Sequence, residues 1–298
     1  MKYPRSLAVL IIMGIASTFA ANHIAARVAF DHGVNVITAV AVRSGLTALI
    51  VLGLLLAWRV PRQLPRTTLW RLGLVGALIL LQSFCLYSAV ARIPVALALL
   101  TFNTTPLVYT LLTWALTGQR PSASTAVAMA VAVAGLALAL GLFTATDAVS
   151  AALTSGIAFA FGASLSFALV LALTDRWLLK VDGRLRSCLS MTVVCLGALA
   201  IALSGITGTG LALPRDPTGW LALGGLTLLY GTAITFTFIL FARLDMPNNS
   251  IALNFEPVAA LGLGWLLLGQ TLGGTQLVGM LVVLGAILYI GTRKGIAA

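Results

Sequence analysis

Ten long apolar runs follow one another along the chain of 298 residues, separated by short charged or Gly/Pro-rich segments. Each run approaches the length of about 20 apolar residues that a transmembrane helix needs. Alternation over about 10 residues, which marks a membrane β-barrel, is absent from the sequence. The sequence therefore predicts an all-α integral membrane protein with ten transmembrane helices. The expected spans are residues 6–29, 34–57, 69–91, 94–116, 122–143, 151–174, 184–206, 217–241, 247–268 and 272–292.

The composition excludes a water-soluble chain, because 60% of the residues are hydrophobic and only 8% are charged. A soluble domain carries roughly 25% charged residues. The three cysteines lie in apolar segments, and their spacing fits neither a metal site nor a disulfide framework. No metal and no cofactor is expected. Lys2 and Arg5 precede the first apolar run as in a signal peptide, but many spans follow, so we expect an uncleaved first helix.

The basic residues predict the orientation of the chain in the membrane. Fourteen Lys and Arg residues fall on the side of the N-terminus, three fall on the other side, and Arg43 is left within the second span. Cytoplasmic loops carry the excess of Lys and Arg, so both termini are expected in the cytoplasm. We expect a multi-pass protein of a bacterial-type inner (plasma) membrane. The net charge of +11 is explained by these loops, so no nucleic-acid partner is expected.

The chain also contains an internal repeat. A shift of 151 residues pairs seven of the seventeen positions from 103 to 119 with identical residues, without a gap. The sequence thus predicts two five-helix repeats, residues 1–146 and 147–298. Five is an odd number, so the second repeat enters the membrane in the opposite sense, a plan typical of secondary transporters. The identical pairs are Asn103/Asn254, Pro106/Pro257, Leu112/Leu263, Trp114/Trp265, Leu116/Leu267, Gly118/Gly269 and Gln119/Gln270.

The second repeat carries N-F-E-P at 254–257, L-G-Q at 268–270 and T-Q-L-V-G-M-L-V-V-L-G-A at 275–286, with counterparts between residues 103 and 135. With ten spans in two repeats, this pattern resembles the drug/metabolite transporter superfamily and its EamA domain. Within it, the chain is most similar to bacterial amino-acid exporters, including those for aromatic amino acids. The chain departs from the family pattern at Gln119 and Gln270, two positions where the family often has glutamate.

The repeat and the resemblance imply a secondary transporter that exports small metabolites by alternating access. Amino acids are the leading candidates for the substrate. Spans 1, 3, 4, 6, 8 and 9 are expected around a central cavity. Spans 5 and 10 are expected at the periphery, where they offer a face for a homodimer. The expected partners are a small-molecule substrate and the lipid bilayer.

Three alternatives stay open at this stage: a multidrug or other metabolite exporter of the same build, a channel or lipid scramblase, and a membrane-embedded enzyme. Against the enzyme, the sequence shows no nucleophile–base pair within the membrane, no metal cluster and no P-loop. We therefore do not expect an enzyme.

Glu256 is the carboxylate that lies well inside a span, whereas the other six acids lie at loops or span ends. Ionisable groups in the membrane are costly and normally face a cavity or a partner. Glu256 either binds a substrate ammonium group or carries a proton, or it is a protonated acid that bonds to a neighbouring helix. The first repeat has Thr105 at the matching position.

Pro106 and Pro257 are expected to kink their helices, because proline frees the carbonyl four residues earlier. These carbonyls belong to Phe102 and Leu253. Asn103 and Asn254, three residues before each proline, either satisfy freed backbone groups or reach a ligand.

Further polar side chains at mid-span complete the expected substrate site: Asn22, Gln82, Tyr87 and Tyr230. His23 is either hydrogen-bonded structure or a second group for proton coupling. Trp114 and Trp265 are expected at opposite membrane faces, either as anchors or as gates.

Overall fold

The computed structural model of the chain describes residues 3–58, 64–118, 120–141, 151–205, 208, 210–240, 244 and 250–294. Within these ranges the regular structure is entirely helical. The elements are α1 (Arg5–Asp31), α2 (Val36–Ala57), α3 (Arg66–Val90), α4 (Val95–Phe102), α5 (Thr105–Thr117), α6 (Ala123–Ala139), α7 (Ala151–Trp177), α8 (Gly183–Ser204), α9 (Pro217–Leu240), the 3₁₀-helix η1 (Ser250–Phe255), α11 (Glu256–Leu268) and α12 (Gly274–Lys294).

Each of the ten predicted spans corresponds to helix in the structure. Spans 4 and 9 differ from the others because they are not continuous α-helices: α4 and α5 form the fourth, and η1 and α11 form the ninth. Seven spans are long and apolar enough to cross a membrane on length and composition, and three shorter apolar helices cover 123–139, 252–268 and 274–289. Large apolar side chains face outward, such as Leu203 at 86% and Leu221 at 77% exposure. An exterior of this kind belongs in a bilayer.

Local signals set several helix ends. The side chain of Asn35 accepts the backbone N–H of Thr38 at the start of α2, and Ser122 accepts that of Thr125 at the start of α6. Such side chains satisfy N–H groups that the first turn leaves unpaired. The repeated glycines Gly118 and Gly269 end α5 and α11 in the left-handed conformation, with φ of 72° and 62°.

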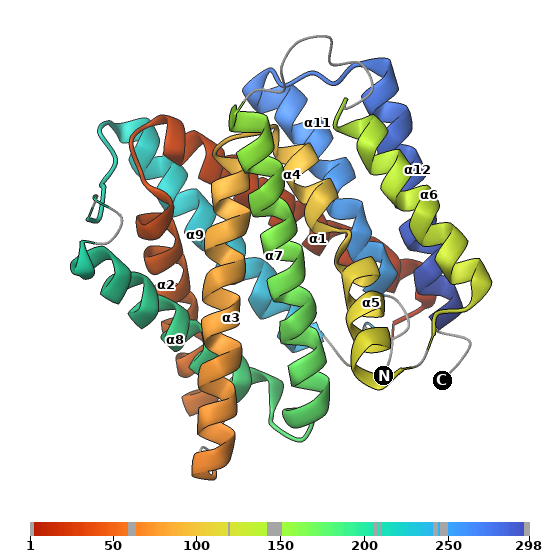
Figure 1. The fold of residues 1–298 in the computed structure, drawn as a ribbon. Coiled ribbons are helices and arrows are strands. Elements are labelled where there is room, and N and C mark those ends of the chain that lie inside the picture. Colours follow the sequence, from red (N-terminus) through yellow and green to blue (C-terminus); the bar gives the residue numbers. More distant parts are fainter. Residues whose placement is uncertain are drawn as a thin grey trace.

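The two repeats are interleaved rather than side by side. Helix α2 packs on α8, α4 on α11, and α6 on α12, so equivalent spans of the two repeats meet each other. The pair α1 and α9 corresponds in the same way to the pair α7 and α3. This pattern is what an approximate two-fold axis between inverted repeats produces. Figure 1 shows the α6–α12 pair at one edge of the bundle and α2 with α8 at the other.

Small residues bring α6 and α12 into close contact. A Cβ atom placed on Gly279 of α12 would collide with the backbone of Ala139 and would lie 2.6 Å from the carbonyl oxygen of Gly135. A Cβ on Gly135 would lie 2.7 Å from a methyl group of Val282. Glycine at these positions therefore allows the two backbones to approach, as is common between membrane helices.

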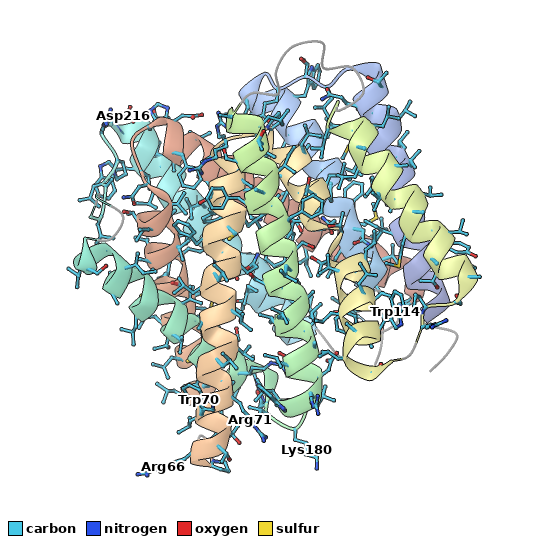
Figure 2. All side chains as sticks on the ribbon, viewed as in Figure 1. Arg66, Trp70, Arg71, Trp114, Lys180 and Asp216 are labelled. Carbon is cyan, nitrogen blue, oxygen red and sulfur yellow. The ribbon has the colours of Figure 1, made fainter. Side chains whose placement is uncertain are left out.

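The ends of the bundle differ in charge. Arg66, Arg71 and Lys180 lie together at one end, and Asp216 lies at the opposite end (Figure 2). Helix α1 begins and α12 ends at the basic end (Figure 1). Helices α5 and α11 end at opposite ends of the bundle, so they carry Trp114 and Trp265, both exposed, to opposite faces.

At the end of the bundle that carries Asp216, a contact between His32 and Asp216 joins the two repeats. Nδ1 of His32, which caps α1, lies 2.6 Å from Oδ2 of Asp216, just before α9. Oδ1 of Asp216 also accepts the backbone N–H of Gly219 at 2.8 Å. The N–H of Gly219 and then the His32 side chain lower the pKa of the Asp216 carboxyl.

We expect Asp216→Asn to lower the melting temperature by about 1 to 3 °C near pH 7. Asparagine caps a helix as well as aspartate does, so the change removes the charge and keeps the bond to Gly219. Because the folded-state pKa is depressed, the carboxylate stabilises above its unfolded pKa and the effect is lost as the pH falls through the folded pKa. Melting temperatures of both proteins, measured in detergent between pH 7 and pH 3, should therefore converge at the acid end. A constant difference across this range would contradict the role of the charge.

Candidate functional site

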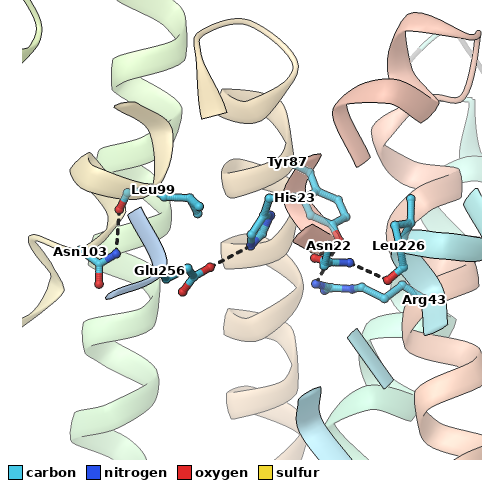
Figure 3. Close-up of polar contacts among 8 residues, drawn as sticks. All are labelled: Asn22, His23, Arg43, Tyr87, Leu99, Asn103, Leu226 and Glu256. Atoms are coloured by element: carbon cyan, nitrogen blue, oxygen red, sulfur yellow. Dashed lines mark hydrogen bonds and ion pairs between the residues drawn. The ribbon is translucent and has the colours of Figure 1, made fainter. Parts of the chain in front are cut away.

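The fourth span is interrupted at Asn103 and Thr104, between α4 and α5, with Pro106 as the second residue of α5. Proline removes the N–H that the carbonyl of Phe102 would otherwise accept. The hydroxyl of Thr105 donates to this carbonyl at 2.6 Å. The amide Nδ2 of Asn103 instead donates to the carbonyl of Leu99 at 2.9 Å (Figure 3). The freed carbonyl is thus satisfied by threonine and not by the asparagine that the sequence analysis considered.

The ninth span is interrupted before a proline in the same way, but its new helix begins with a glutamate. The 3₁₀-helix η1 gives way to α11 at Glu256, and Pro257 is again the second residue of the new helix. Glu256 therefore stands in the first turn of α11, where the helix dipole stabilises a negative charge. Asn254 lies on η1, half-buried, and its side chain has no hydrogen bond within the described part of the chain. At both prolines the span is broken into two helices rather than kinked.

Glu256 contacts the first repeat through His23. Oε1 of Glu256 lies 3.4 Å from Nε2 of His23 on α1 (Figure 3). The two side chains are only 16% and 6% exposed, and Nδ1 of His23 is buried without a hydrogen-bond partner. The pair joins a carboxyl group of the second repeat to an imidazole of the first.

Beside this pair, a directed chain of hydrogen bonds crosses four helices. Arg43 on α2 donates to the hydroxyl of Tyr87 on α3 at 3.4 Å, and Tyr87 donates to Oδ1 of Asn22 on α1 at 3.1 Å. Nδ2 of Asn22 donates to the backbone carbonyl of Leu226 on α9 at 2.6 Å. The ring of Tyr87 also meets the ring of His23 edge-on, at 5.5 Å between centroids. Glu256, His23, Tyr87, Asn22 and Arg43 thus form one connected set (Figure 3).

Arg43 is the residue that the sequence analysis did not include in the site. It is the eighth residue of α2 and is 4% exposed. An arginine at the centre of a membrane helix costs about 2.5–3.5 kcal/mol on insertion scales. Its guanidinium donates to Ser83 at 2.9 Å and lies 3.9 Å from the ring centroid of Tyr230 and 4.9 Å from that of Tyr87. The sequence did contain a signal for this residue: Arg43 is the one basic residue that lies well inside a span rather than in a loop or near a span end on either side of the membrane.

The structure places the other expected residues around this set. Tyr230 covers Arg43, and its hydroxyl lies 4.0 Å from the sulfur of Met191. Gln82 is half-buried, and its Oε1 accepts a hydrogen bond from the hydroxyl of Ser83 at 3.4 Å. Asn103 lies on the other side of Glu256 from this set, where it is bonded to its own helix (Figure 3).

Gln270 has a structural contact that accounts for an amide at this position. Its Oε1 accepts the backbone N–H of Val95 at 3.1 Å, at the start of α4. The first N–H groups of a helix have no partner within the helix. A neutral amide oxygen is sufficient for this cap between the repeats. Gln119, its counterpart, lies outside the described residues.

The fold is that of a polytopic membrane protein with a two-repeat architecture, and a buried polar set lies where the two repeats meet. The model of the EamA-like transporter family matches residues 6–141 and 154–292. The chain therefore belongs to the EamA-like transporter family, whose members are transporters of the drug/metabolite transporter superfamily.

Two further comparisons bear on the chain. It is similar to a solved crystal structure described only as that of a protein, with a TM-score of 0.63 and 18% sequence identity. The similarity covers 99% of each chain and supports the fold. No curated protein matches the sequence.

Proposed function

We propose that the protein is a secondary transporter that exports small metabolites, with amino acids first, by alternating access. The observation that carries this proposal is the contact between Glu256 and His23, 3.4 Å apart, at a helix break within the bundle. A carboxylate at such a break binds a primary ammonium group by a charge-assisted hydrogen bond. Because the contact joins the two repeats, motion of one repeat against the other alters it.

The same proposal assigns roles to the other expected residues. Asn22 and Tyr87 hold the helices around Glu256 in register through the bonds to Leu226 and Arg43. Asn254 and Gln82 offer amide groups, and Tyr230 offers an aromatic face to the substrate. His23 exchanges a proton with Glu256.

The proposed setting is a bacterial-type inner membrane, with both termini in the cytoplasm. The gathering of Arg66, Arg71 and Lys180 at the end of the bundle where α1 begins supports this orientation. We place the boundary between the repeats at 146/147, outside the described residues and between the two family matches. Helices α6 and α12 expose Val131 and Leu281 at the edge of the bundle, a face available to a homodimer.

Counterflow in proteoliposomes tests the proposal. Vesicles with purified protein are loaded with one unlabelled amino acid at a time, and uptake of the labelled form is followed without a pH gradient. Saturable exchange that protein-free vesicles lack is the expected result. Failure with every amino acid would overturn the amino-acid proposal, and competition by lipophilic cations would point to a multidrug exporter. Unsaturable flux would indicate a channel or a scramblase.

A further inference from the structure

The positive charge of Arg43 is not balanced by a carboxylate within the described part of the chain. Each acid there has another partner. Glu256 lies against His23, Asp31 against Arg27, Asp216 against His32 and Asp182 against Arg184, and Asp175 accepts from Tyr109. Buried charges are normally paired or they coordinate a ligand. The rings of Tyr87 and Tyr230 give the guanidinium only partial compensation through cation–π contacts.

The guanidinium also has unused hydrogen-bonding capacity. Its two terminal nitrogens each donate one bond, to Ser83 and to Tyr87, whereas Nε is buried without any partner. An arginine side chain presents five N–H donors in a planar fork that matches a carboxylate. A buried donor that lacks an acceptor is costly. The unsatisfied fork therefore points to an anionic acceptor that arrives with the transported molecule.

We infer that Arg43 binds the carboxylate of the substrate, while the Glu256–His23 pair receives its ammonium group. This inference rests on the proposed function and defines the substrate as a zwitterion. The two charged ends of the site are bridged by Tyr87, whose hydroxyl accepts from Arg43 and whose ring contacts that of His23. A single guanidinium with an acid in the same polar set suits a monoanion better than a phosphate dianion, which Glu256 would repel.

The Tyr230 ring covers one face of the Arg43 guanidinium. Its ring lies 3.9 Å from the guanidinium carbon, and Tyr230 is itself half-buried rather than fully enclosed. The ring of Phe19 meets it edge-on at 5.9 Å between centroids. Rotation of Tyr230 uncovers the guanidinium and leaves aromatic surface for the apolar part of the substrate.

A matched pair of probes tests the inference without transport. The probes are 3-phenylpropanoate and its neutral analogue 3-phenylpropanamide, and binding to the purified protein is measured by thermal shift over a concentration series. We expect the carboxylate to bind about tenfold to hundredfold more tightly than the amide, as is typical of a charged hydrogen bond. Equal binding of the two probes by the wild-type protein, or tighter binding of inorganic phosphate than of the carboxylate, would overturn the inference.

Three variants connect the preference to Arg43. Arg43→Gln should abolish it, and Arg43→Lys should retain only part of it, because lysine lacks the planar fork. Arg27→Gln is the control, since Arg27 pairs with Asp31 and donates to the carbonyl of Val90 rather than to a residue of the site. An unchanged preference in Arg43→Gln would show that Arg43 is a structural residue. If that variant does not fold, the wild-type comparison and Arg43→Lys still decide the matter.

The outcome is separable from that of the proposed function. If no amino acid exchanges in counterflow but the carboxylate preference depends on Arg43, the amino-acid proposal fails and the carboxylate site stands. If amino acids exchange but their carboxamides compete equally well, the transporter stands and the role of Arg43 is wrong.

Discussion

Gly279→Ala is expected to destabilise the protein by about 1–3 kcal/mol and to lower its melting temperature by about 3 to 10 °C. The new methyl group would collide with the backbone of Ala139 and approach the carbonyl oxygen of Gly135. Backbone atoms cannot swing aside as a side chain can, so α12 must move away from α6. The two helices would then lose contacts along their shared face. Thermal unfolding in detergent, followed by tryptophan fluorescence, measures the effect.

Gly285→Ala provides the matched control on the same helix. A Cβ atom at Gly285 meets nothing within 4 Å, and the residue is exposed. Because alanine favours helix by up to about 1 kcal/mol over glycine, this variant should be neutral or slightly more stable. Similar melting temperatures for Gly279→Ala and Gly285→Ala would contradict the close packing of α12 on α6 at Gly279.

Glu256→Gln is expected to reduce amino-acid counterflow by about tenfold to hundredfold, the effect of losing one hydrogen bond to a charged group. Glutamine has nearly the same shape and can still bond to His23, so the melting temperature should change little. The comparison therefore isolates the charge. The measurement is the initial rate of exchange in proteoliposomes that contain equal amounts of folded protein.

Asp31→Asn is the control for this experiment. Asp31 is also an acid of the first or last turn of a helix, but it pairs with Arg27 and its side chain is 53% exposed. It should leave exchange unchanged. Full exchange by Glu256→Gln would remove Glu256 from substrate binding and leave it as a structural acid or a proton site. If Glu256→Gln lowered only the export that is driven by a pH gradient, Glu256 would be a proton site.

The fold was largely predictable because its determinants are local. Apolar runs of membrane length mark each span, and the limits agree within a few residues, as for 217–241 against Pro217–Leu240. The repeat and its inverted sense followed from the matched Asn, Pro and Trp positions. The broken spans were anticipated only as kinks. The new helix begins at Thr105, and its hydroxyl donates to the freed carbonyl of Phe102; a bond of this kind has no strong sequence signal.

The site was less predictable because its members come from distant segments. Glu256 and His23 were each recognised as polar residues within spans, but their contact is a property of packing between repeats. Asn103 was considered for a freed carbonyl and bonds to another one. Arg43 was treated as a leftover cation, since its partners Ser83, Tyr87 and Tyr230 lie on other helices. The hydropathy of the sequence shows that a charged side chain in a span is costly, but it does not show which side chains pack around it.

The bond between Asn22 and the carbonyl of Leu226 spans 204 residues of sequence, and this separation constrains the synthesis of the protein. At about 5–20 residues per second, a ribosome needs roughly 10 to 40 seconds to make the intervening chain. During this interval α1 has left the ribosome while its partners on α9 and α11 do not yet exist. The bond of Asn22 to Tyr87, only 65 residues away, can form much earlier than the bond to Leu226. The contacts of α1 with α9 and α11 therefore close late in synthesis, after the contact of α1 with α3 is already available.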